Sequence, residues 1–444
     1  MRNSTFDDKC CGLMVGCAVG DALGAPVEGL KPGHIKTLFK ILDDYIEPHI
    51  YLKKGLKTYR AKGFYTDDTQ QMLTVCDTIL ENNGLTPDKL SQKFIELSRE
   101  DIPNGFGVFR GTGRFFRATM QELINGLPWD IATGNTAGCM AAVRQAPVVI
   151  HYFSSITQLM TKTIEASLVT HKDPIAICCA LWMVYLLHEL ISDFSDEPPD
   201  ITDLLKRSEQ FCAKGEKILA SNYKHIITTS HTEGIYSVSS FIKGFAEILQ
   251  TDDNSLIDDH ILDYANKYSS KPIKKLTVPF SLAIIPLAIK IFFQITRHSD
   301  ASFEKTIVTA INLGGDTDTL GALVGALAGG YYGFDAIPQR WKTGLVNINQ
   351  IKLRAEILSK NKKKKGYQNL FEMEKKLTQF EALQFEKYSS LLKKKPKKPS
   401  KKIDPTLSEK KSILPPKEKK VARRKFEKKK TQEKKYRRQN KTEF

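Results

Sequence analysis

The chain has 444 residues and a formal net charge of +17, but residues 361–444 alone hold 30 Lys and Arg against 10 Asp and Glu. The residues before them hold 37 basic and 40 acidic side chains, are close to neutral, and suffice to bury a large core. Acidic residues near the N-terminus, together with apolar runs shorter than about 20 residues, predict a protein that is neither secreted nor embedded in a membrane. Eight cysteines without metal-ligand spacing predict reduced, buried thiols and an intracellular location, cytoplasmic or nuclear.

The first predicted element is a helix over residues 8–24, which are mostly small and apolar. Its glycines recur at every fourth position and therefore share one face, which favours close packing against another helix: Gly12, Gly16, Gly20 and Gly24. Pro26 ends this helix and leaves Glu28 at the start of a loop, where an isolated glutamate is usually solvated. Residues 30–64 show no sustained period and predict a loop with one short helix.

An acidic cluster opens the next predicted helix, over residues 66–82. Two carboxylates and two hydroxyls stand directly before an apolar stripe of helical spacing: Thr66, Asp67, Asp68 and Thr69. A further helix is expected over residues 87–99, behind a capping threonine and a proline at the first helical position.

Two weaker polar motifs follow in the middle of the chain. The run from Gly134 and Asn135 to Gly138 precedes an expected helix through Val143, so its backbone N–H groups could hold an anion such as a diphosphate; an ordinary Gly-Asn turn is the alternative. His171 stands at the entrance of an apolar helix, where a histidine is more often a cap or packing residue than a catalyst. Residues 278–294 predict two buried helices separated at Pro286.

The stretch from Asn312 to Thr319 is the most distinctive in the chain. It places Asp316, Asp318 and two threonines on a Gly-Gly turn before a helix whose glycines again recur every fourth residue. Oxygen ligands suit Mg²⁺, Mn²⁺ or Ca²⁺, although an acidic helix cap is the simpler alternative. If this cluster meets Asp67 and Asp68, four carboxylates would repel one another, and a bound cation would resolve the repulsion.

The end of the chain changes character by degrees. Residues 346–392 keep apolar positions at helical intervals and predict a helical extension of a domain that spans residues 1–345. Residues 393–444 are rich in Lys and Arg, cannot bury a core, and predict a disordered tail. Such a tail could bind nucleic acid or another polyanion, or could serve only to keep the protein in solution.

Five ordered motifs resemble the ADP-ribosylglycohydrolase family over roughly residues 8–345. They are Gly20 to Glu28, Tyr65 to Thr69, Gly134-Asn135, Thr170-His171 and Gly314 to Thr319. The resemblance implies an all-α fold, a compact orthogonal multi-helix bundle, and a metal-dependent hydrolase. Its substrate would be an ADP-ribosylated protein side chain or an ADP-ribose-containing small molecule, cleaved at the glycosidic bond.

The resemblance also implies roles for individual residues. Two Mg²⁺ or Mn²⁺ ions would be held by Thr66, Asp67, Asp68, Asp316, Asp318 and Thr319. Catalytic roles would fall to Glu28, Asp67, Asp68 and Asp316, and contacts to ADP-ribose to Gly134, Asn135 and His171. One branch of the family has a further carboxylate in a segment where this chain has Val108, which argues against an arginine-linked substrate.

Two other classes of function stay open from the sequence. A catalytically inactive ADP-ribose-binding module would keep the pocket and lose turnover, although all six implied metal-ligand positions carry the expected residue types. A nucleic-acid-associated protein would depend on the basic tail alone.

Overall fold

The computed structural model describes residues 4–47, 59–103, 105–195, 199–228, 238–251, 253–360 and 365–393. Residues 391–393 are described by their backbone alone. The predicted tail beyond Lys393 lies outside these residues. The described residues contain α-helices, one short 3-10 turn and no β-strand, so the predicted all-α class is confirmed. Residues Met1–Lys393 form one compact unit, which includes the helices after residue 345.

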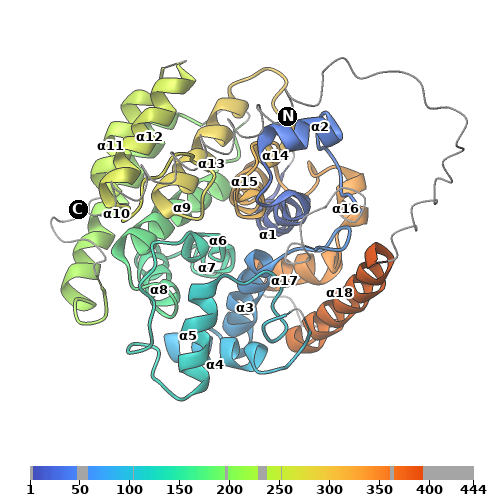
Figure 1. The fold of residues 1–444 in the computed structure, drawn as a ribbon. Coiled ribbons are helices and arrows are strands. Elements are labelled where there is room, and N and C mark those ends of the chain that lie inside the picture. Colours follow the sequence, from blue (N-terminus) through green and yellow to red (C-terminus); the bar gives the residue numbers. More distant parts are fainter. Residues whose placement is uncertain are drawn as a thin grey trace, which may run out of the picture. The chain divides into compact units, whose positions relative to one another are not determined.

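The helices follow the chain from the N-terminus to the last described residue (Figure 1). They are α1 (Phe6–Gly24), η1 (Ala25–Val27), α2 (Pro32–Phe39), α3 (Asp67–Asn82), α4 (Pro87–Ser98), α5 (Arg114–Ile124), α6 (Met140–Val143), α7 (Ala146–His151), α8 (Ile156–Leu168), α9 (Pro174–Ser192), α10 (Ile201–Asn222), α11 (Val238–Ile248), α12 (Asn254–Tyr268), α13 (Ser281–Thr296), α14 (Phe303–Ile311), α15 (Thr317–Tyr332), α16 (Gln339–Gly344), α17 (Ile348–Lys360) and α18 (Leu370–Lys393).

The centre of the fold is the contact between α1 and α15, which lie side by side in Figure 1. A Cβ atom built on Gly12 would collide with the backbone of Gly329, and one built on Gly20 would collide with Gly321. The pairing runs in opposite directions along the two helices, so they are antiparallel. The prediction that each glycine face packs closely against another helix is confirmed, and the two faces pack on each other.

This antiparallel contact decides which chain ends meet. Since α1 ends where α15 begins, Gly24 lies against Thr317, and the Thr317 hydroxyl donates a hydrogen bond to the Gly24 carbonyl at 2.9 Å. The loop that carries Glu28 therefore emerges beside the acidic turn at Asp316.

The last two helices pack on the same unit through buried ion pairs. Arg354 of α17 makes a two-pronged contact with Asp77 of α3, with distances of 2.7 and 3.1 Å. Glu374 of α18 pairs with Arg110 at 2.9 Å, and all four side chains are almost completely buried. The region after residue 345 is thus tied to the helix that begins with Asp67.

One expectation about helices is wrong. Residues 281–296 form the single helix α13 with Pro286 inside it. Pro286 removes only one backbone hydrogen bond, and the buried side chains before and after it in the helix outweigh that loss. The helix expected after Gly138 and through Val143 is confirmed as the four-residue helix α6.

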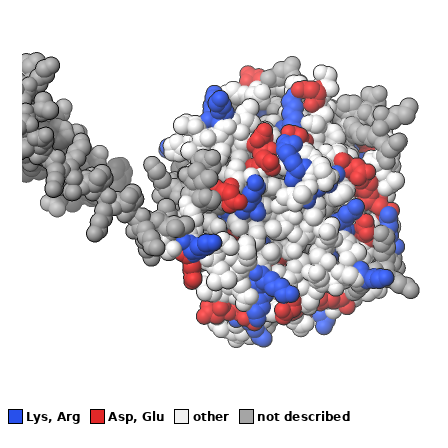
Figure 2. Space-filling view, turned by 90° about the vertical axis from the view of Figure 1, so that its right-hand side faces the viewer, with Lys and Arg blue, Asp and Glu red and all other residues white. Residues whose placement is uncertain are grey.

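The apolar character of two helices is explained by burial. The spans Phe6–Val27 and Pro174–Ser192 are long and apolar enough to cross a membrane, but 100% and 83% of their most apolar windows are buried within the protein. All eight cysteines lie in the described residues, are buried and form no disulfide, as predicted. On the face shown in Figure 2, acidic and basic side chains are interspersed, which agrees with the near neutrality of the residues before 361.

Candidate active site

The acidic turn before α15 is built by two glycines in a left-handed conformation. Gly314 and Gly315 have φ angles of +68° and +80°, and a side chain at either position would collide with Leu30 or Thr277. The Gly315 N–H donates to the Leu30 carbonyl at 2.9 Å, and the Gly29 N–H donates to the Gly315 carbonyl at 2.7 Å. These bonds join the turn to the loop that follows Glu28, so neither position accepts another residue without strain.

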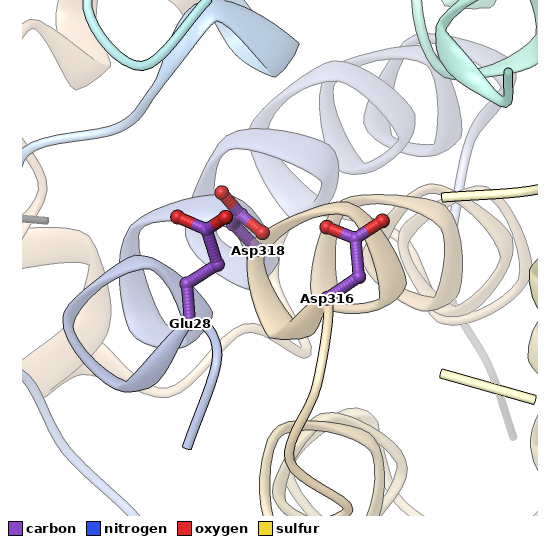
Figure 3. Close-up of side chains that lie close together, drawn as sticks. All are labelled: Glu28, Asp316 and Asp318. Atoms are coloured by element: carbon purple, nitrogen blue, oxygen red, sulfur yellow. The ribbon is translucent and has the colours of Figure 1, made fainter. Parts of the chain in front are cut away.

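Three carboxylates meet where these segments join. One oxygen each from Glu28, Asp316 and Asp318 lies within 4.8 Å of the other two (Figure 3). Glu28 comes from the loop after α1, and the two aspartates come from the start of α15. Their exposure falls from Glu28, at the surface, to Asp318, which is buried. This spacing lets all three ligate one cation, so Glu28, expected as a catalytic residue, is also a candidate ligand.

The second acidic cluster is held in place by Asp21 of α1. Its carboxylate accepts hydrogen bonds from the backbone N–H groups of Thr66 and Thr69 and from the Thr69 hydroxyl, at 2.6 to 3.0 Å. Asp21 is completely buried, and burial raises its pKa. Sequence reasoning gave it no role, although it stands in the Gly20 to Glu28 motif that carried the resemblance.

At the start of α3, the residue that caps the helix is a threonine and not one of the aspartates. Thr66 is the capping residue, since its hydroxyl accepts from the Asp68 N–H at 3.3 Å. The Asp67 carboxylate instead accepts a hydrogen bond from the Gln71 side chain at 2.9 Å, and the backbone N–H of Asp67 donates to the Arg110 carbonyl at 2.8 Å. Asp316 precedes α15 without making a side-chain cap bond. The cap alternative therefore does not account for Asp67 or Asp316.

The electrostatics link the two acidic helix starts. Burial raises the pKa of Asp68 well above its usual value, and the charge of Asp318 is the strongest contribution from a neighbouring group. Burial and the charge of Asp318 likewise raise the pKa of Asp316. Asp68 therefore belongs to the same buried acidic centre as Asp316 and Asp318, about 250 residues away in the chain.

Two carboxylate oxygens in this centre lack hydrogen-bond partners among the described residues. They are Oδ1 of Asp68 and Oδ2 of Asp316, both buried. Buried carboxylate oxygens are normally hydrogen bonded, and several of them together repel one another. An oxygen-only set with orphaned buried atoms fits a hard divalent cation such as Mg²⁺ or Mn²⁺.

Two groups at the edge of the centre have pKa values close to neutral. Burial raises the pKa of Asp67 to about 7, and the charge of Asp21 adds to the shift. Partial removal of water raises the pKa of Glu28 to about 7 as well, with Asp316 adding to it and Arg60 opposing it. A cation bound nearby would lower both pKa values and favour the ionised carboxylates.

The predicted ADP-ribose contacts lie in a separate loop beside the centre. The Gly134 carbonyl accepts from the Lys172 N–H at 2.7 Å, and the Asn135 side chain accepts from the Thr228 hydroxyl at 2.5 Å. Burial raises the pKa of Cys139, at the end of this loop, and the charges of Asp316 and Asp68 add to the shift. Gly134 and Asn135 lie in the loop that leads into α6, and their contact with ADP-ribose stays a prediction.

His171 is neutral in this arrangement. Burial lowers its pKa well below the usual value, and the charge of Arg144 adds to the effect. One ring nitrogen lies 2.8 Å from the Thr170 hydroxyl, and the other faces Gly138. The ring is therefore suited to hydrogen bonding and not to anion attraction by charge.

An all-helical fold with a buried, oxygen-only carboxylate centre defines the class of this protein, and comparison with known proteins gives its family. Residues 2–368 match the family described as ADP-ribosylglycohydrolase, so the chain belongs to the ADP-ribosylglycohydrolase family and is a hydrolase of that kind.

Similar proteins come from all domains of life. An uncharacterized protein of Archaeoglobus fulgidus is 27% identical, covering 77% of this chain and 92% of its own. ADP-ribosylhydrolase ARH3 of Bos taurus is 21% identical, covering 78% and 91%. ADP-ribosyl-dinitrogen reductase glycohydrolase of Rhodospirillum rubrum is 22% identical, covering 78% and 92%. A solved structure titled as an ADP-ribosylglycohydrolase-related protein complex, 24% identical, covers 80% of this chain and 98% of its own with a TM-score of 0.53, which shows the shared fold.

Proposed function

We propose that this protein hydrolyses the glycosidic bond between ADP-ribose and a modified protein side chain or related acceptor, using two Mg²⁺ or Mn²⁺ ions. The observation that carries the proposal is the group of Glu28, Asp316 and Asp318 within 4.8 Å of one another, beside buried carboxylates with unpartnered oxygens. The names of the Bos taurus and Rhodospirillum rubrum relatives support an ADP-ribosyl substrate.

The ligand sets follow from the two acidic helix starts. One ion would be held mainly by Thr66, Asp67, Asp68 and Asp318, and the other mainly by Asp316, Asp318 and Thr319. When bound, the ions would supply the positive charge that binds ribose hydroxyls and lowers the pKa of a water molecule. An oxygen of Glu28 lies close enough to those of Asp316 and Asp318 to serve as an additional ligand.

The remaining steps belong to side chains of the protein. We propose that Glu28 orients the attacking water or the scissile group, because it is the exposed one of the three clustered carboxylates. Gly134 and Asn135 would contact the ribose and phosphates through the loop beside the centre, and neutral His171 would hydrogen bond to the ligand. The substrate anomeric carbon would then lie between the ADP-ribose loop and Glu28, where an oxocarbenium-like state is stabilised by the surrounding carboxylates.

The test is release of ADP-ribose from an ADP-ribosylated peptide. We expect release with Mg²⁺ or Mn²⁺, loss of release with EDTA, and a decrease of at least about a hundredfold for Asp316→Ala, because removal of a charged group at a reaction centre costs several kcal/mol. Asp259→Ala, at an exposed position of α12, is the matched control and should keep full activity.

The outcome also separates the rival classes. Equal release from all samples, including those with EDTA, would refute a metal-dependent site. Tight binding of ADP-ribose measured by calorimetry, without any release from several linkages, would instead identify an inactive binding module.

A further inference from the structure

The carboxylate of Asp67 is held by a buried glutamine one turn further along α3. The Gln71 side chain is completely buried, and its Nε2 donates to Asp67 Oδ2 at 2.9 Å. Residues four apart share one face of a helix, so this contact is built into the start of α3. The neighbouring Gln70 instead donates to Glu374 of α18 and to the Val108 carbonyl. Of the two glutamines, Gln71 is the one that contacts the acidic centre.

Arg144 fixes the direction of the Gln71 amide. It stands between α6 and α7, two short helices that contact α3 (Figure 1). Its side chain is completely buried, and Nη1 donates to Gln71 Oε1 at 3.1 Å. A guanidinium carries donors and no acceptor, so only the oxygen of the amide can face it. The NH₂ group of Gln71 must then face Asp67, because the reversed amide would set donor against donor and oxygen against carboxylate.

The guanidinium of Arg144 is held without a carboxylate. Nη2 donates to the Ala166 carbonyl at 2.6 Å, and the guanidinium carbon lies 5.3 Å from the centre of the Phe94 ring. Among the described residues Arg144 forms no ion pair, and its Nε has no acceptor. Burying a charge in this way is costly. A side chain that only filled space would be better apolar, and Gln71 is the side chain that Arg144 orients.

The two oxygens of Asp67 have different surroundings. Oδ2 is occupied by Gln71, whereas Oδ1 accepts a hydrogen bond from no other residue among those described. Oδ1 lies beside Gly111, where a Cβ would be 3.3 Å from it. The backbone of Asp67 is held separately, since its N–H donates to the Arg110 carbonyl at 2.8 Å. Loss of Gln71 would therefore free the carboxylate and leave the start of α3 in place.

A carboxylate at this position needs a restraint. Asp68 is the next residue, and the carboxylate of Asp21 accepts from the N–H groups of Thr66 and Thr69 on either side of the pair. Like charges so close would turn a free carboxylate away from its neighbours. A neutral amide holds one oxygen without cancelling the charge that attracts a cation, which a lysine or arginine in its place would do.

We propose that Gln71 is a positioning residue, oriented by Arg144, that holds Oδ2 of Asp67 so that Oδ1 is presented to a divalent cation. The inference rests on the proposed two-ion site and adds two residues outside its set of ligands. Removal of a hydrogen-bonding partner from a metal ligand lowers metal affinity by about ten- to a hundredfold.

The test is the affinity of the full-length protein for Mn²⁺ at pH 7.5, measured by electron paramagnetic resonance of the free ion. Gln71→Met keeps the length of the side chain and removes both hydrogen bonds, so we expect the Kd of at least one ion to rise by about tenfold or more. Saturating Mn²⁺ should restore release of ADP-ribose, because Gln71 acts through Asp67. Arg144→Met should raise the Kd by a smaller factor, although removal of a positive charge by itself would lower it.

Gln145→Met is the matched control. Gln145 is also completely buried, and it donates to the Ala141 carbonyl at 2.7 Å and to the Ser167 hydroxyl at 3.3 Å. We expect this variant to lower the midpoint of urea unfolding about as much as Gln71→Met and to leave the affinity for Mn²⁺ unchanged. An equal loss of affinity in Gln145→Met would show that general damage explains both and would overturn the inference.

The failure of this inference differs from the failure of the hydrolase function. Equal binding of Mn²⁺ by the wild type and Gln71→Met would overturn the role of Gln71 and leave the metal site standing, and equal or tighter binding by Arg144→Met would overturn the role of Arg144. A wild type that binds no Mn²⁺ would refute the two-ion site and the inference with it.

A crystal structure of the wild type with Mn²⁺ decides the question if neither variant folds. Contact of the ion with Oδ1 of Asp67, while Oδ2 stays on Gln71, would uphold the inference. A Gln71 side chain turned away from Asp67 would overturn it.

Discussion

The glycine contact between α1 and α15 can be tested with a single methyl group. In Gly325→Ala the added Cβ would collide with the carbonyl oxygen of Gly16 and lie 2.8 Å from its carbonyl carbon. Both are backbone atoms, so no side-chain rotation relieves the collision. Overpacking costs about 1–3 kcal/mol, and the upper end applies here; alanine regains about 1 kcal/mol of helix propensity. The net loss of stability should be about 2 kcal/mol.

The matched control is Gly330→Ala in the same helix. Its nearest neighbours are the side-chain ends of Ile191 at 3.3 Å and Leu13 at 3.7 Å, which can move by a few tenths of an ångström. We expect a change of about zero to 1 kcal/mol in the stabilising direction, from helix propensity alone. Urea unfolding followed by circular dichroism measures both variants under one condition. Equal midpoints for the two variants, or a larger loss for Gly330→Ala, would show that the close backbone contact does not determine the packing.

Three further predictions concern the surroundings of the site. Glu374→Gln should destabilise the protein by about 3–5 kcal/mol, because it leaves Arg110 buried without its carboxylate, whereas Glu372→Gln, at an exposed position of α18, should change stability by less than about 0.5 kcal/mol in the same urea assay. In EDTA, the free energy of unfolding should fall as pH rises from about 4 to about 7. The pKa values of Asp67 and Glu28 are raised in the folded chain, which therefore keeps protons that the unfolded chain has released. Thermal unfolding at a series of pH values measures this, and a rise in stability over that range would contradict it. Mn²⁺ should raise the melting temperature more at pH 7.5 than at pH 5, since it binds the ionised carboxylates, and an equal rise at both would argue against ligation by these groups.

The sequence predicted those parts of the fold that depend on local spacing. Glycines four residues apart showed that two helices each have a bare face, and the structure confirms that these faces pack together. The same periodicity gave the positions of α3 and α15 with their acidic starts, because capping residues and apolar stripes are local signals.

Long-range contacts carried no such signal. Glu374 and Glu381 contact Arg110 and Arg60, which lie more than 250 residues earlier, and nothing in the composition of α18 distinguishes these two glutamates from its exposed ones. Asp21 was visible within a motif, but its role as an acceptor for the start of α3 depends on how α1 and α3 cross. The prediction of a break at Pro286 was wrong because the burial of side chains along α13 outweighs the one backbone hydrogen bond that proline removes.

We propose that two distant acidic helix starts and Glu28 together form a centre for two divalent cations. Electron paramagnetic resonance of free Mn²⁺, titrated with the full-length protein at pH 7.5, counts the bound ions directly. We expect two bound ions per chain in the wild type. In Asp318→Asn, which alters the residue proposed to contact both ions, we expect weaker binding with at least one ion lost. Undiminished free Mn²⁺ in the presence of the wild-type protein, or equal binding by Asp318→Asn, would contradict it.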